Sequence, residues 1–180
     1  MAAIDLDIGN PFFEGMDGEF GGPGVEGHVG SDWFEAFGND LGAPAGTMVH
    51  AVYDGKITKI DVTSLDSTTG PSYGAGIFVR AANDNLDPDA AGGVGCYYTH
   101  VTLAGGITEG AFIARGDDIG EVIEVGGIPP HLHFAIAERR GGTNFGINIF
   151  NWLLESANTQ DVARLTFSQD GQPPQIVFPI

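Results

Sequence analysis

Cations and cysteine are scarce in this chain of 180 residues. Seven Lys and Arg stand against 24 Asp and Glu, which gives a formal net charge of −17. Such a charge repels nucleic acid phosphates and anionic membranes, so neither is expected as a partner. The single cysteine excludes an internal disulfide framework and also a closed zinc site built from thiolates.

Long apolar runs are missing as well. No run approaches the roughly 18 residues of a membrane-spanning helix, so no membrane span is expected. The first seven residues, Met1 to Asp7, lack the basic region and the apolar core of a signal peptide. A location outside the cell would therefore require a leader that preceded this chain or another export route.

Glycine is abundant, at 29 residues, and favours tight turns and a strand-rich fold. Short strand-like runs separated by glycine turns fill residues 25–138, and apolar spacing predicts one helix over 148–156. Asp54-Gly55, between two such runs, predicts a hairpin. The fold class expected is mostly β: a compact antiparallel sheet domain with few short helices.

Three segments are expected along the chain. Residues 1–24 have no sustained period and form an N-terminal arm, 25–138 form the main domain, and 139–180 form a C-terminal extension packed on that domain. Trp33 and Phe34 are expected to belong to the core rather than to a substrate platform.

Histidines and one aspartate give the chain a candidate catalytic site. His28 and Asp32 lie near the start, His100 lies in the middle, and His131 and His133 follow. Catalytic zinc is usually held by three nitrogen or oxygen side chains with a fourth position open to water. This inventory supplies three such ligands and leaves two histidines for proton transfer, so it points to hydrolysis.

Strand periodicity supports this interpretation. Because successive side chains of a strand point to opposite faces, His131 and His133 share one face and Leu132 faces the core. By the same rule Tyr98 and His100 share a face of the neighbouring segment. One face of the sheet should therefore carry three histidines and a tyrosine.

These residues occur within an ordered set of motifs that resembles the lysostaphin-type, or LytM-like, zinc metallopeptidases, which cut peptidoglycan peptides. The resemblance covers about residues 25–138. Its motifs are Gly27-His28-Val-Gly-Ser-Asp32, Gly42-Ala-Pro-Ala-Gly-Thr-Met-Val-His-Ala51, Asp54-Gly55, Tyr73-Gly-Ala-Gly76, Tyr98-Thr-His100, Arg115-Gly-Asp-Asp-Ile-Gly120 and Pro130-His-Leu-His-Phe134.

The resemblance implies one zinc ion per chain, with His28, Asp32 and His133 as its ligands and His100 and His131 as catalytic residues. The fold implied has its site in a groove on one sheet. One of the two catalytic imidazoles would take a proton from water and the other would steady the developing oxyanion.

Two tyrosines are further candidates at this site. Tyr98 is a candidate for a hydrogen bond to the tetrahedral intermediate, and Tyr73 is a candidate for lining the groove. Packing is the alternative role for both.

The function implied is a zinc-dependent endopeptidase that hydrolyses peptide crosslinks of peptidoglycan, in a protein that is secreted, periplasmic or delivered to the cell wall. Two alternatives stay open. One is the same chemistry on glycine-rich protein, and the other is a non-catalytic, zinc-containing module that binds cell wall or belongs to a virion or secretion apparatus.

Overall fold

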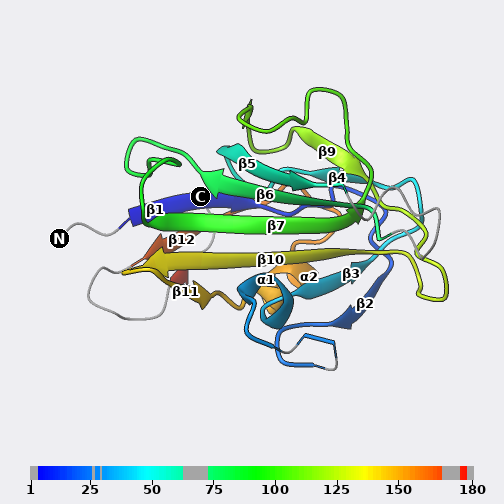
Figure 1. Cartoon of the computed structure of the whole chain (residues 1–180). Coiled ribbons are helices and arrows are strands. Elements are labelled where there is room, and N and C mark those ends of the chain that lie inside the picture. The colour runs from blue at the N-terminus through cyan, green and yellow to red at the C-terminus, as the bar shows by residue number, and fades with distance from the viewer. Residues whose placement is uncertain (1–3, 26, 29, 63–72, 168–174, 178–180) are drawn as a thin grey trace.

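An antiparallel sheet of eight strands forms the centre of the fold (Figure 1). The structure is a computed structural model and describes residues 4–25, 27, 28, 30–62, 73–167 and 175–177. The strand order is β2-β3-β10-β7-β6-β5-β8, and β11 pairs with β10 beside β3. The strands are β2 (Gly18–Gly21), β3 (Asn39–Gly42), β5 (Gly55–Asp61), β6 (Ala75–Ala81), β7 (Gly93–Val101), β8 (Phe112–Ile113), β10 (His131–Arg140) and β11 (Thr143–Gly146).

Two smaller sheets and two short helices complete the fold. The sheets are formed by β1 (Ile4–Gly9), β12 (Val162–Phe167) and β13 (Gln175–Val177), and by β4 (Met48–His50) with β9 (Asp118–Glu121). The helices are α1 (Trp33–Ala36) and α2 (Phe150–Glu155). The paired strands run antiparallel. The expected mostly β fold is confirmed.

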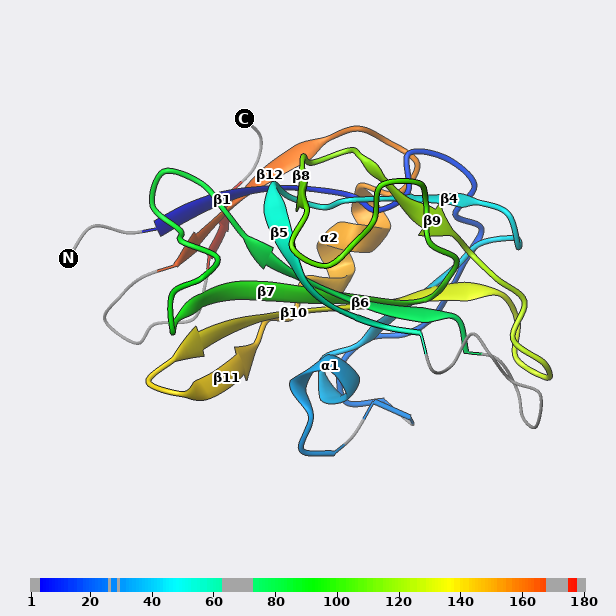
Figure 2. The ribbon, with the colours of Figure 1, turned by 45° about the horizontal axis from the view of Figure 1, so that its top comes forward.

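The large sheet separates two sides of the molecule. Figure 2 shows α1 on one side and α2, β1, β4 and β12 on the other. The second side holds the core, where Leu132, Phe134 and Ile136 of β10 are fully buried together with Leu153 of α2. On the side of α1, the rings of Phe78 and Tyr97 on the sheet contact Phe34 of the helix.

Two expectations about local structure need correction. The predicted helix over 148–156 is confirmed in place but is shorter, and α1 was not predicted. The predicted hairpin at Asp54-Gly55 is wrong, because β4 pairs with β9 whereas β5 pairs with β6 and β8. Tyr53 explains the difference: it is fully buried and its hydroxyl donates to the Val79 carbonyl, so the segment enters the core and connects two sheets.

The two terminal segments lie side by side. Strand β1 pairs with β12 over six residue pairs, and Leu6, Ile8, Ala163 and Leu165 are all buried in the same core. The boundaries expected after residues 24 and 138 stay predictions. Neither helix in the described residues is long and apolar enough to cross a membrane.

Candidate metal centre

The register between β3 and β10 places a carboxylate opposite a histidine. Asp40 is paired directly with His133 in the antiparallel ladder. Residues opposite each other in such a ladder point to the same face, so the two side chains meet. On the other face of the same strands Leu41 pairs with Leu132, and both are fully buried. Burial of the leucines fixes the register and with it the polar pair.

Strand β10 carries two histidines on this face, as the alternation predicts. His131 and His133 are 5% and 9% exposed, while Leu132 and Phe134 between and beyond them pack into the core. The ring of His133 lies against Gly38, where a Cβ would overlap the imidazole. Glycine is therefore required at this point for the ring to fit under the chain that leads into β3.

His28 reaches the same point from the loop before α1. Its Nε2 lies 3.0 Å from Asp40 Oδ2, and its ring centroid lies 5.0 Å from that of His133. On the other side of the carboxylate, His133 Nδ1 lies 2.9 Å from Asp40 Oδ1. One possible ligand atom from each of the three residues lies within 4.8 Å of the others.

Backbone carbonyls fix the tautomer of both imidazoles. His28 Nδ1 lies 2.9 Å from the Gly22 carbonyl, and His133 Nε2 lies 2.7 Å from the Phe34 carbonyl. A carbonyl oxygen only accepts, so in each case that ring nitrogen is the donor. In the neutral rings the lone pairs of His28 Nε2 and His133 Nδ1 therefore face Asp40.

This donor set fits zinc. Metal-bound histidines almost always donate their second N–H to a carbonyl, a carboxylate or water, and both rings already do so. Ligand bonds of about 2.0–2.1 Å in a tetrahedral site put neighbouring ligand atoms about 3.3 Å apart. His133 Nδ1 lies 2.9 Å from Asp40 Oδ1 and His28 Nε2 lies 3.0 Å from Asp40 Oδ2, so each ring nitrogen is near that separation from one oxygen of the carboxylate. Two nitrogens and one carboxylate oxygen form the ligand set expected of a catalytic site with an open position.

Two further histidines border this centre and are held in the same way. His131 Nδ1 lies 2.8 Å from the Pro129 carbonyl, and His100 Nδ1 lies 2.8 Å from the Tyr73 carbonyl. Their ring centroids are 4.7 Å apart. Since Nδ1 is the donor in each ring, Nε2 is left as the proton acceptor in both.

The backbone of His100 is unusual, with φ at +67°. Non-glycine residues seldom adopt this left-handed conformation, although histidine does so more often than most. Tyr98 and Val101 on either side are buried in the core, whereas the His100 ring lies beside His131. The left-handed residue interrupts the alternation of β7 and turns His100 toward the centre.

The electrostatics of the cluster favour a neutral His100 and an ionised Asp40. Burial, together with the neighbouring His131 and His133, lowers the pKa of His100 to about 4, against the hydrogen bond to the Tyr73 carbonyl and the charge of Asp40, which both raise it. Burial alone would raise the pKa of the Asp40 carboxyl, but the histidines around it, His133 foremost, leave it lowered overall. At neutral pH the centre thus offers an anionic ligand and an unprotonated base.

The structure does not bring Asp32, a predicted ligand, to this cluster. That residue is exposed at the N-cap of α1, where its carbonyl accepts from the Ala36 amide. Asp40 takes its place beside His28 and His133. The H-x-x-x-D spacing from His28 ends at the helix cap, whereas the carboxylate that meets the histidines comes from the following strand.

Tyr98 is also misplaced by the sequence-based interpretation. It is 1% exposed on the core face, where its hydroxyl accepts from the Val52 amide and its ring packs on Phe134. It therefore cannot touch a substrate at the histidines. Tyr73 is 46% exposed and its ring lies 6.3 Å from that of His100, so its contact with substrate stays a prediction.

Sequence reasoning missed Asp40, although a signal was present. Asp40 lies two residues before the motif that begins at Gly42, separated from it by the apolar Leu41. The carbonyls that orient the rings leave no trace in the sequence.

The model of Peptidase family M23 matches residues 35–145. The matched segment contains Asp40, His100, His131 and His133, and it begins after His28. No curated protein matches the chain significantly in sequence.

Three solved structures share the fold, each with a TM-score of 0.50. Lysostaphin from Staphylococcus simulans, an antimicrobial peptidase, is 19% identical over 83% of this chain and 55% of its own. The solution structure of lysostaphin is 21% identical, over 82% of this chain and 54% of that one. A LytM protein from Ruminococcus gnavus is 21% identical over 68% and 47%. The chain thus spans about half the length of these neighbours. Because the family model covers well over half of the chain, the protein belongs to Peptidase family M23.

Proposed function

We propose that the protein is a zinc-dependent endopeptidase that hydrolyses peptide crosslinks of bacterial peptidoglycan, with one zinc ion held by His28, Asp40 and His133. The observation that carries this proposal is the convergence of three ligand atoms within 4.8 Å beside two more histidines that are not needed as ligands. A purely structural zinc site would use a fourth protein ligand and would have no use for the spare pair.

When bound, zinc would lower the pKa of a coordinated water and polarise the scissile carbonyl. Asp40 contributes the negative charge of the ligand set, and the lowered pKa of its carboxyl keeps that charge present at neutral pH. His28 and His133 supply lone pairs whose direction is set by the Gly22 and Phe34 carbonyls. The site is therefore organised before any metal arrives.

His100 and His131 handle the proton. The Nε2 atom of each ring is unprotonated in the neutral form, and that of His131 lies 3.7 Å from Asp40 Oδ1. One of these rings accepts the proton of the attacking water, and the other, once protonated, donates to the developing oxyanion or to the leaving amine. The pKa of His100, at about 4, suits it to stay neutral until a proton reaches it.

The substrate class rests on the family and on the neighbours. Membership in Peptidase family M23 supports a peptidase, and lysostaphin, which shares the fold, is described as an antimicrobial peptidase. These likenesses support peptidoglycan peptides as the substrate and action at the cell wall, which we adopt as part of the proposal.

Hydrolysis of purified sacculi, with and without a chelator, tests the proposal. The wild type should release soluble peptides, and the chelator should stop the release until zinc is added back. His131→Ala should keep zinc and lose about 10²–10⁴-fold in activity, the usual contribution of a positioned acid or base. A folded, zinc-loaded protein that cleaves neither sacculi nor peptides would instead indicate a non-catalytic module.

A further inference from the structure

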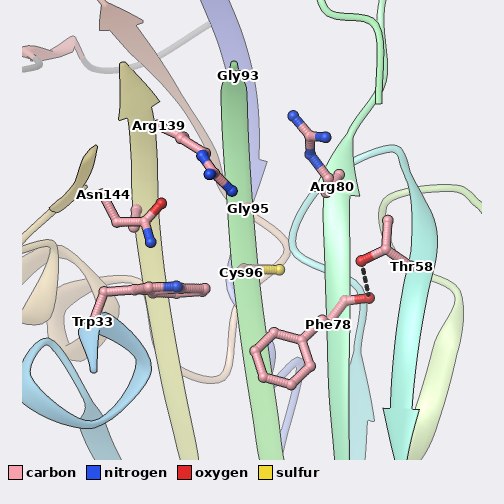
Figure 3. A pocket seen from close by; sticks show the side chains of 10 residues that line it. Trp33, Thr58, Phe78, Arg80, Gly93, Gly95, Cys96, Arg139 and Asn144 are labelled. Atoms are coloured by element: carbon pink, nitrogen blue, oxygen red, sulfur yellow. Dashed lines mark hydrogen bonds between the residues drawn. The ribbon is translucent and has the colours of Figure 1, made fainter. Parts of the chain in front are cut away.

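A cavity of about 170 Å³, whose lining Figure 3 shows, borders β10 at Ala137 and Arg139, which follow His133 by four and six residues. Its lining includes Trp33, Phe78, Arg80, Gly95, Arg139 and Asn144. Trp33 was expected in the core but is half-buried at the wall of this cavity. The volume suits one side chain or one chain end rather than a larger ligand.

Small residues at facing positions create this hollow. Gly95 of β7 is paired with Ala137 of β10 on one side and with Arg80 of β6 on the other. A Cβ at Gly95 would meet nothing closer than the Val79 carbonyl oxygen at 3.7 Å. The space thus comes from side chains that are small or missing at the floor, and a larger residue would fit there.

Positive charge gathers around the cavity although the protein as a whole carries −17. Arg80 and Arg139 both line it, and the Lys59 ammonium lies 5.6 Å from the centre of the Phe78 ring. Two of the seven Lys and Arg residues of the chain therefore line this cavity, and a third lies beside one of its aromatic rings. Such a concentration in an acidic protein indicates an anionic ligand.

The two arginines differ in what they already bind. Arg80 donates to the Ala90 carbonyl at 2.7 Å and to the Gly92 carbonyl, so its guanidinium is fixed to the loop before β7. Arg139 is exposed and, among the residues that the structure describes, pairs with no carboxylate. Figure 3 shows its guanidinium extending beside Gly93 and Gly95, on the side of the cavity opposite Trp33 and Phe78. An arginine in this setting matches the planar, bidentate geometry of a carboxylate.

Aromatic rings connect the cavity to the metal centre. The Tyr97 ring lies 6.2 Å from the His133 ring and 4.5 Å from that of Phe78, which lines the cavity. From His133 to Ala137 and to Arg139 the strand spans about 13 and 20 Å, at about 3.3 Å per residue. An extended peptide advances by about the same length per residue, so it would reach the cavity roughly four to six residues from the bond at the metal.

We propose that this cavity is a substrate subsite that binds a free carboxylate of the peptide, with Arg139 as its ion-pair partner and Trp33 and Phe78 packing against the adjoining apolar part. The inference rests on the proposed function, since it assumes that a peptide lies with its scissile bond at the histidines. It adds a requirement that the zinc chemistry does not contain: a carboxylate at a fixed distance from the bond that is cut.

Two crosslinked stem peptides test the subsite, one with free carboxylates at its far end and one with the matching amides. The wild type should hydrolyse the carboxylate form with a kcat/KM about tenfold higher. Arg139→Gln should remove that preference and leave the amide peptide unchanged. Arg115→Gln, which removes an equal charge at an exposed arginine outside the cavity lining, is the matched control and should keep the preference.

Gly95→Leu fills the floor of the cavity and provides an independent test. It should raise KM for both long peptides while a short peptide that ends before the cavity is cleaved as by the wild type. Equal rates on the two long peptides for the wild type, or an equal loss on both in Arg139→Gln, would overturn the subsite.

Binding separates the subsite from the catalysis. Fluorescence anisotropy with the labelled peptides and the Asp40→Ala variant measures affinity without cleavage. Carboxylate-dependent binding by Asp40→Ala, with a zinc-loaded wild type that cleaves neither peptide, would contradict the proposed function and keep the subsite. Cleavage of both peptides by the wild type without any preference for the carboxylate form would contradict the subsite and keep the proposed function.

Discussion

Replacing His100 by glycine should give a more stable protein than replacing it by alanine, because the backbone at this position is left-handed. The φ angle of His100 is +67°. For an L-residue this conformation costs about 1–2 kcal/mol, whereas glycine adopts it freely. Glycine in turn loses about 0.5–1 kcal/mol more conformational entropy on folding. The difference leaves His100→Gly ahead of His100→Ala by about 1 kcal/mol.

Both variants lose the same imidazole, its bond to the Tyr73 carbonyl and its contact with His131, so those losses cancel in the comparison. Thermal unfolding in the presence of a chelator is the assay. For a chain of this size, 1 kcal/mol corresponds to a rise in Tm of about 2–4 °C. His100→Asn should lie nearer to the glycine variant, because asparagine tolerates the left-handed region better than alanine does.

His100→Gly and His100→Ala should both be inactive on peptide substrates, because each lacks the proton-accepting Nε2 atom of the imidazole. If alanine proved as stable as glycine at this position, the backbone of His100 would not be held in the left-handed region. The turning of its side chain away from the core would then need another explanation.

Three further outcomes are expected. Gly38→Ala should lower zinc affinity by about 10–100-fold in a competition titration, because the added Cβ would displace the His133 ring. Gly105→Ala is the control: a Cβ at Gly105 would contact no other atom, so zinc affinity should be unchanged. Burial raises the pKa of the Cys96 thiol to about 12, so a thiol reagent at pH 8 should label Cys96 only after unfolding; rapid labelling of the native protein would contradict its burial. The rate of hydrolysis of whole sacculi should rise with added salt, as the Debye length falls from about 30 Å to about 8 Å, whereas the rate on a small neutral peptide should barely change. A steep fall in the rate on sacculi with added salt would show that local cations dominate docking.

How far the sequence predicts this fold depends on how local each signal is. The alternation in β10 predicted the faces of His131 and His133, because period-two patterning is a property of one strand. The apolar spacing that predicted α2 is local in the same sense. The single turn of α1 has no such pattern.

The errors arise where the structure depends on contacts distant in sequence. Asp40 meets His133 through pairing between β3 and β10, at a separation of 93 residues. The spacing between His28 and Asp32 is a local pattern and carries no information on that register. Tyr98 was placed with His100 because strict alternation was assumed, and one left-handed residue is enough to break it.

The proposed subsite illustrates the same difference between local patterns and contacts distant in sequence. The sequence contains Arg139, Gly95 and Trp33 but does not show that they surround one cavity. Their meeting depends on the register of three strands and on the position of α1 above the sheet. Net charge alone predicted repulsion from anionic partners, and the structure shows that the few cations are not spread evenly.

Zinc content of two aspartate variants tests the central claim most directly. Asp40→Ala removes a proposed ligand from the centre, and Asp32→Ala removes an exposed carboxylate at a helix cap. Metal analysis of the purified proteins should find close to one zinc per chain in the wild type and in Asp32→Ala, and almost none in Asp40→Ala. Retention of zinc by Asp40→Ala, with its loss from Asp32→Ala, would contradict the centre described here.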